Sequence, residues 1–428
     1  MTLPVASVVV ASRGRPAALR RLLTALRFQD HPAFEVVVVS DEQGAAILRA
    51  PGVAPDVKHA PFGAANLSAA RNRGIAQAAG AAVAFIDDDA VPEPSWLRRL
   101  TAPLAEPDVG AAGGFVRGRN GLSFQWTARQ VDGFGVHAPL DVDPEAATVL
   151  RPGDGWAVKT EGTNCAFRRD VLVRLGGFDE AFRFYLDETD LNWRLAEAGW
   201  ATAIVPRAEV HHMMAAGPYR RADRVPRDLF EIGASQAYFC TRHGTAAGRA
   251  RALGAFHAAQ RRRILTHMVA GRVEPRDVRR LMTGLEAGLA EGASRAPRMA
   301  RLTRPPAAFR PFAAHGPDAA GVVLAGRRRH WPRLRAAAAA RAAAGEIVTL
   351  LELSFSPAYH RAGFADDGYW WQRGGVYGRA LRDAPRLRPA TLSGRAMAEA
   401  RRIAQVRPVS EVGIDGAPPK PLAGDPGA

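Results

Sequence analysis

The chain has little cysteine and no long apolar run. Cys165 and Cys240 are its two cysteines, too few for a disulfide framework or a cysteine-based zinc site, which agrees with a reducing compartment. No stretch of about 18 apolar residues occurs that could cross a bilayer. The first residues also lack the basic flank and apolar centre of a signal peptide. We therefore expect a cytoplasmic protein.

Negative charge is also scarce relative to positive charge. Asp and Glu total 42 against 58 Lys and Arg, which gives a formal net charge of +16 and a pI of about 11.0. Such an excess favours an anionic partner, although a GC-rich genome produces an Arg- and Ala-rich composition without any selection for binding. The hydrophobic fraction of 47% is that of a globular protein, and 428 residues suffice for two or three domains.

Three consecutive carboxylates follow a short apolar run. Ala82 to Ile86 predicts a buried strand, and Asp87, Asp88 and Asp89 come directly after it. Because side chains alternate along an extended segment, Asp87 and Asp89 point the same way and can share one divalent ion, while Asp88 faces elsewhere. Mg²⁺ or Mn²⁺ held in this way completes its shell with water and phosphates, so a nucleoside diphosphate is the natural partner. A solvated acidic turn that caps the next helix is the alternative.

The first third of the chain alternates strands and helices. This order, with strands buried on both faces, predicts an α/β fold with an open, largely parallel sheet that binds ligands at the carboxyl ends of its strands. Asp41 and the three consecutive acids fall at such ends. The expected strands are Val5 to Val10, Phe34 to Val39, Val57 to His59 and Ala82 to Ile86. One expected helix has Pro16 in its first turn, and another spans Ala69 to Ala79 with Ser68 as its N-cap.

A second group of acids lies near residue 190. We expect Asp187 and Glu188 just before a helix, beside two aromatic residues, where partial burial would raise a carboxyl pKa towards the range of a general base. Asp190, in the first helical turn, suits the helix dipole. A strand from Ala201 to Val205 follows, and then His212, which is either a structural histidine or a further metal ligand close to the aspartate pair.

In combination these motifs resemble the inverting family 2 glycosyltransferases, which have the Rossmann-like GT-A fold. The resemblance runs from Val5 to about His212 and rests on five motifs that agree in order and spacing. They are Ser12 to Pro16, Asn66 to Gly74, Phe85 to Asp89, Gly176 to Glu180 and Asp187 to Leu191. The resemblance implies a nucleoside-diphosphate-sugar donor, a saccharide or lipid-linked acceptor, and Mn²⁺ or Mg²⁺ as cofactor, with no nucleic acid partner.

The resemblance also assigns roles to individual residues. Asp87 and Asp89 match the family's DXD metal motif, and His212 falls where many members have a histidine near the metal. The family's Glu-Asp base motif reads Asp187-Glu188 here, so Glu188 takes the position of the catalytic base and Asp187 stays a candidate. The residues expected to bind the nucleotide sugar are Ser12, Arg15, Asp41, Arg71, Asp87 and Asp88.

The implied activity is transfer of a sugar to an acceptor hydroxyl in polysaccharide or glycolipid synthesis, with inversion at the anomeric carbon. One alternative is a non-catalytic carbohydrate-binding protein that kept the fold. Another is an aspartyl-nucleophile phosphatase, because Asp87 to Val91 also fits the DxDx[T/V] pattern of that class. The sequence does not identify the donor sugar, the acceptor or the linkage.

Beyond the resemblance the chain divides by composition. We expect a GT-A domain at 1–214, an Arg- and Ala-rich helical region at 215–304, a Pro-rich linker at 305–320, a small C-terminal α/β module at 321–385 and a mostly disordered tail at 386–428. The basic helices allow two interpretations: peripheral docking on anionic lipid at the inner face of a membrane, or a solvated basic face.

Overall fold

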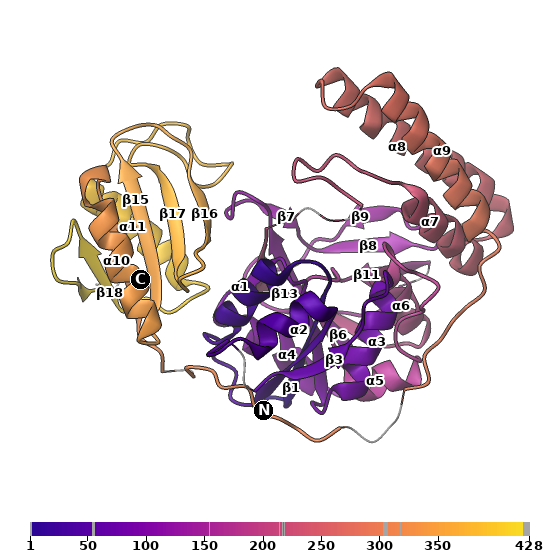
Figure 1. The fold of residues 1–428 in the computed structure, drawn as a ribbon, viewed down its shortest axis with the longest axis horizontal. Coiled ribbons are helices and arrows are strands. Elements are labelled where there is room, and N and C mark those ends of the chain that lie inside the picture. Colours follow the sequence, from indigo (N-terminus) through magenta and orange to yellow (C-terminus); the bar gives the residue numbers. More distant parts are fainter. Residues whose placement is uncertain are drawn as a thin grey trace.

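The computed structural model describes residues 2–53, 56–153, 155–213, 215, 217, 219–302, 307–316 and 318–422. Within this part of the chain a central α/β domain is followed by a projecting pair of helices and by a small α/β module (Figure 1). Residue 214, which we expected to end the first domain, and residues 303–306, where the linker begins, lie outside the described residues.

The central domain is built on a ten-stranded, mostly parallel sheet, as predicted from the sequence. Strands β1, β2, β3 and β4 are parallel, and β12 is antiparallel to β4 and β6, which flank it. Two short strands extend it: β5 pairs with β13, and β7 with β6. The main path runs β10 (Thr148–Leu150), β13 (Ala201–His212), β6 (Val109–Arg117), β12 (Cys165–Arg168), β4 (Ala82–Phe85), β1 (Ala6–Ser12), β2 (Phe34–Ser40) and β3 (Lys58–Pro61), with β5 at Ala90–Pro92 and β7 at Phe124–Trp126.

Helices cover both faces of this sheet because its strands are apolar on both faces. Val8 and Val36 face a core formed with α1, α2 and α4, whereas Val9 and Val37 face a second core formed with α3, α5 and α6. The helices are α1 (Pro16–Leu26), α2 (Glu42–Arg49), α3 (Leu67–Gln77), α4 (Trp96–Thr101, continued by a 3-10 turn at Ala102–Ala105), α5 (Arg169–Arg174) and α6 (Asp187–Glu197). A separate small sheet consists of β8 (Arg129–Asp132), β9 (His137–Pro139) and β11 (Trp156–Lys159).

Several element boundaries differ from the sequence prediction. Helix α3 begins earlier than expected: Asn66 caps it by accepting from the Ala69 amide at 3.0 Å, while Ser68 donates to a carbonyl of a distant loop. Helix α6 begins at Asp187, so the two candidate bases lie in its first turn and not before it. Strand β13 continues past Pro206, because a change of register against β6 accommodates the proline.

The Arg- and Ala-rich region forms α7 (Phe230–His243), α8 (Ala246–Val269) and α9 (Pro275–Gly292). Helices α7 and α9 pack closely at small residues: a Cβ on Gly288 would lie 2.0 Å from the Phe230 carbonyl oxygen. Helix α8 buries fully only Ile264 of its 24 residues and extends from the domain together with α9 (Figure 1). Among the described residues, no helix combines the length and apolarity that crossing a bilayer requires.

The C-terminal module contains a second sheet in the order β16-β17-β15-β14-β18-β19, with β17, β15, β14 and β18 parallel. The expectation of a mostly disordered tail at 386–428 was wrong for its described part, because α11 packs Ala396, Ala400 and Ile403 into the core of this module. The buried face of α11 also carries Arg395 and Glu399, so the composition of this segment does not reveal a packed helix. The elements are β14 (Gly321–Gly326), a 3-10 turn (Arg328–His330), α10 (Trp331–Ala343), β15 (Ile347–Ser354), β16 (Arg361–Phe364), β17 (Trp370–Gly375), α11 (Leu392–Ala404), β18 (Glu411–Ile414) and β19 (Lys420–Pro421).

Candidate functional site

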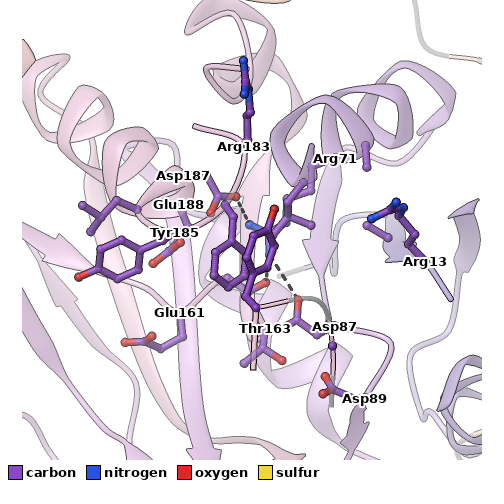
Figure 2. A pocket seen from close by; sticks show the side chains of 18 of the residues that line it. Arg13, Arg71, Asp87, Asp89, Glu161, Thr163, Arg183, Tyr185, Asp187 and Glu188 are labelled. Carbon is purple, nitrogen blue, oxygen red and sulfur yellow. Dashed lines mark hydrogen bonds and ion pairs between the residues drawn. The ribbon is translucent and has the colours of Figure 1, made fainter. Parts of the chain in front are cut away.

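A cavity of about 450 Å³ opens where β1 and β4 end. Its wall includes the loop after β1, the start of α3, the acidic loop after β4, strand β11, the start of α6 and the end of β13. This is where a mostly parallel sheet is expected to bind its ligands. Figure 2 shows that Asp87 and Asp89 lie on one side of this cavity, and that Asp187 and Glu188 lie across from them.

Asp87, Asp89 and His212 converge in this cavity, as the sequence predicted for metal ligands. Each offers one ligand atom, and these atoms lie within 4.8 Å of one another. Burial opposes ionisation of Asp89, but the His212 ring and Arg15 outweigh it and hold the pKa of this carboxyl below its usual range. Two carboxylates and an imidazole fit Mn²⁺ or Mg²⁺, both of which accept further oxygen ligands from a substrate phosphate.

Asp88 does not line the cavity, as predicted, although the three acids lie in a turn after β4 and not on the extended segment that we expected. It is fully buried, accepts from Ser12 Oγ at 2.7 Å and pairs with Arg15 Nη2 at 3.1 Å. Burial raises the pKa of the Asp88 carboxyl to about 7, although Arg15 opposes the rise. Ser12 and Arg15 themselves line the cavity, and Arg15 Nη1 also lies 3.1 Å from Asp89. Asp88 therefore connects the loop after β1 to the acidic loop after β4 without itself lining the cavity.

Asp41 does not line the cavity. Its two carboxylate oxygens accept from backbone amides, Oδ1 from Gly44 at 3.1 Å and Oδ2 from Gly14 at 2.8 Å. The first bond caps α2, and the second ties α2 to the loop that carries Arg15. The role of Asp41 in binding the nucleotide stays a prediction.

Arg71 connects the two acidic groups across the cavity. Its guanidinium pairs with Asp187, lies 3.4 Å from Asp87 and donates to the Gly162 carbonyl at 2.9 Å. The side chain is almost fully buried, and Gly74 lets α3 approach β1 closely enough to place it there. Burial opposes its charge, but Asp187 and Asp87 more than compensate and raise the pKa of Arg71.

Asp187 and Glu188 follow two residues with strained backbone. Tyr185 and Leu186 have φ values of 74° and 64°, a left-handed conformation that costs about 1–2 kcal/mol per residue outside glycine. Such strain is retained when it serves a site, and here it turns the chain so that α6 presents both acids to the cavity.

The two acids have different partners. Glu188 Oε1 accepts from Lys159 Nζ at 2.8 Å and from Thr189 Oγ1 at 3.0 Å, while Asp187 pairs with Arg71. Burial would raise the pKa of Glu188, but Lys159 outweighs it and lowers that pKa to about 2. Burial raises the pKa of Asp187 to about 7, with Arg71 opposing the rise and the Glu188 charge adding to it. The rise in pKa that we expected from burial thus occurs at Asp187 and not at Glu188, whose carboxyl is ionised at neutral pH.

Part of the cavity wall had no signal in the sequence. Lys159 and Glu161 come from the end of β11, and Arg129 from β8 pairs with Glu161. Trp126 of β7 places its ring 5.7 Å from that of His212. Trp126, Arg129 and Lys159 lie on strands of three or four residues, and Glu161 follows one of them; such strands are too short for a periodicity that predicts burial or direction.

Asp190, beside the candidate bases, belongs to the scaffold. It is fully buried and pairs with Arg194 at 2.8 Å and with His243 at 2.8 Å. The His243 contact fastens the first turn of α6 to α7, whereas Arg194 lies in α6 itself.

Comparison with known proteins agrees with this geometry. Residues 4–227 match the family model described as glycosyltransferase like family 2. A pre-mycofactocin glycosyltransferase of Mycobacterium tuberculosis is 30% identical over 214 residues, 48% of this chain and 42% of the relative. An N-acetylglucosaminyl-diphospho-decaprenol L-rhamnosyltransferase of the same species is 33% identical over 186 residues, 37% of this chain and 59% of the relative. The chain thus spans less than two thirds of the length of either relative.

Among solved structures, the mannosyltransferase PcManGT from Pyrobaculum calidifontis, in complex with GDP-Man and Mn²⁺, is similar with a TM-score of 0.41 and 17% identity. That match covers 68% of this chain and 88% of the other. The family match extends over most of the central domain and includes the motifs from which the site was predicted. The chain therefore belongs to the family 2 glycosyltransferases, and its central domain is an α/β domain built on a mostly parallel sheet.

Proposed function

We propose that the protein is a metal-dependent inverting glycosyltransferase that moves a sugar from a nucleoside-diphosphate sugar to an acceptor hydroxyl. The observation that carries this proposal is the placement of two sets of side chains in one cavity. Asp87, Asp89 and His212 form the ion-binding set, and the carboxylates of Asp187 and Glu188 lie across from the two aspartates (Figure 2). An ion-binding group suits the diphosphate, and a separate carboxylate suits the acceptor hydroxyl.

The residues divide the chemistry between them. A bound divalent ion would neutralise the charge that develops on the leaving diphosphate. Glu188, which Lys159 keeps ionised, accepts the proton of the acceptor hydroxyl as that oxygen attacks the anomeric carbon. Attack from the side opposite the diphosphate is a single in-line displacement, which inverts the anomeric configuration. Asp187 and Arg71 position the start of α6.

The proposed acceptor is a saccharide or a lipid-linked saccharide, in polysaccharide or glycolipid synthesis. Support comes from the printed name of one relative, which describes rhamnosyl transfer to a diphospho-decaprenol-linked sugar. We also propose that α8 and α9 make peripheral contact with anionic lipid, because Arg261 and Arg262 are exposed on a helix that extends from the domain.

The metal requirement is tested with Asp89→Ala. A thermal-shift screen of UDP-, GDP- and dTDP-sugars with Mn²⁺ first identifies a donor, since a ligand that binds only the folded protein raises its apparent stability. With that donor, the transfer rate of Asp89→Ala should fall by more than about 100-fold, because residues that only contact a metal ligand already cost about 10–100-fold when they are replaced. The variant should also lose Mn²⁺-dependent donor binding.

Asp141→Ala, which removes an exposed acid outside the cavity, is the matched control and should behave as the wild type. The unfolding temperature without metal reports whether Asp89→Ala still folds. Transfer within about tenfold of the wild type would contradict the metal role of Asp89. Hydrolysis of the donor in the absence of any metal ion would contradict the metal-binding role of Asp87, Asp89 and His212 together.

A further inference from the structure

Strand β5 connects the ion-binding residues to the C-terminal module. It starts directly after Asp89 and pairs antiparallel with the end of β13, so that Ala90 lies opposite His212. The Met213 amide donates to the Asp89 carbonyl at 2.9 Å, and the Glu93 amide donates to the Glu209 carbonyl at 3.0 Å. The ladder between these two strands therefore sets the spacing between Asp89 and His212.

Glu93, at the far end of β5, is buried and bound from two directions. Arg407 donates to it twice, from Nε at 2.8 Å and from Nη2 at 2.6 Å, and His211 Nε2 lies 2.7 Å from Glu93 Oε1. Arg407 holds the pKa of Glu93 far below its usual range against the opposing effect of burial. His211 is the neighbour of His212 on β13, so Glu93 fastens both strands of the ladder.

Arg407 belongs to the C-terminal module, 314 residues from Glu93 in the chain. It is itself buried, donates to Thr349 Oγ1 in β15 at 2.9 Å, and lies 4.5 Å from the centre of the Trp370 ring in β17. Val91 of β5 packs in the same cluster as Trp370. The module thus covers β5 directly and supplies the cation that its buried carboxylate needs.

We propose that Arg407 is a positioning residue for the ion-binding group. Through Glu93 and His211 it fixes β5 against β13, and this holds Asp89 and His212 at the spacing that a divalent ion requires. The inference rests on the proposed function, because it assumes that these residues bind a metal ion. Residues that orient metal ligands from behind typically change metal affinity by about 10–100-fold when they are replaced.

The test is direct Mn²⁺ binding to the full-length protein, followed through the EPR signal of free Mn²⁺. Arg407→Met should bind Mn²⁺ about 10–100-fold more weakly than the wild type, and Arg407→Lys should recover part of the loss. At saturating Mn²⁺ the KM for the donor should change little, because Arg407 lies outside the cavity. His211→Phe keeps a ring, leaves Arg407 and Glu93 paired, and should weaken Mn²⁺ binding in the same direction.

The matched control is Asp366→Asn, which breaks the Arg21–Asp366 ion pair between the module and α1 without touching β5. It should bind Mn²⁺ as the wild type does. If Arg407→Met lowers the unfolding temperature but binds Mn²⁺ normally, Arg407 only docks the module and the inference is overturned. If Arg407→Met does not fold, His211→Phe decides in the same way. If the wild type itself does not bind Mn²⁺, the metal-dependent function fails first and the inference with it.

Discussion

Replacing Lys159 by Met should move the acid limb of the pH–rate profile to higher pH. Lys159 is buried, and its Nζ lies 2.8 Å from Oε1 of Glu188, the proposed base. A base must be deprotonated to act, so activity is lost as the pH falls through its pKa. With the pKa of Glu188 lowered to about 2, the wild type should keep this carboxylate ionised throughout the working range of pH.

The size of the effect follows from the contact. Lowering the pKa of Glu188 from 4.5 to about 2 corresponds to about 3 kcal/mol in favour of the charged form, since one pKa unit is worth about 1.4 kcal/mol; this is the net effect of Lys159, Arg71 and a backbone hydrogen bond against burial. Lys159 is the largest of the lowering causes, so without it burial is opposed much less and the pKa of Glu188 should rise. Lys159 also lies 3.3 Å from Glu161, but Glu161 keeps its ion pair with Arg129 in the variant. The substitution therefore acts mainly on Glu188.

The assay is kcat and kcat/KM at saturating Mn²⁺ across about pH 5 to 8, with Lys159→Arg as the control that preserves the charge. We expect a flat acid side for the wild type and for Lys159→Arg, and a falling one for Lys159→Met. Identical profiles for Lys159→Met and the wild type would refute the reasoning. A wild-type profile that already falls with a midpoint of about 7 would instead identify Asp187 as the base, because burial raises its pKa to about that value.

Two further predictions concern the base and the basic helices. Glu188→Gln keeps the shape of the side chain but accepts no proton, so kcat should fall by about 10²–10⁴-fold with little change in donor affinity. If Glu188→Gln has a mild effect and Asp187→Asn a large one, Asp187 is the base and Glu188 is not. The double variant Arg261→Glu/Arg262→Glu should sediment less with anionic vesicles than the wild type. Binding of the wild type to these vesicles should weaken as salt rises. The matched control is Arg328→Glu/Arg329→Glu on the C-terminal module, which should bind as the wild type does. Equal binding to neutral vesicles would exclude an electrostatic contact.

The fold of the central domain could be predicted because its signals are local. The valine runs of β1 and β2 and the leucine stripe of α1 each specify an element within a few residues. The shared direction of Asp87 and Asp89 was predicted correctly but from the wrong geometry, because β4 ends at Phe85 and a turn closed by the Ala90 amide and the Asp87 carbonyl, not an extended segment, carries these acids. The structure confirms a mostly parallel sheet, and the family match confirms the resemblance.

What the sequence did not reveal depends on contacts between distant segments. Lys159 reaches Glu188 on α6 from the end of β11, and Arg407 reaches Glu93 across 314 residues, so no sequence spacing predicts either pair. Helix α11 escaped prediction because its buried face combines Ala396, Ala400 and Ile403 with Arg395 and Glu399, which weakens the apolar signal. The nucleotide-binding roles of all six assigned residues stay predictions, and two of these residues, Asp41 and Asp88, do not line the cavity.

The ion pair between Glu93 and Arg407 also has a consequence for biosynthesis. Translation proceeds from the N-terminus, so Glu93 leaves the ribosome 314 residues before its partner. Until Arg407 emerges, a nascent domain that buried Glu93 would offer it His211 but no guanidinium, and a buried carboxylate without its cation is unfavourable. The long strands of the central sheet can therefore pair early, as N-terminal units generally do. The segment after Asp89 reaches its final packing only once the C-terminal module has been made.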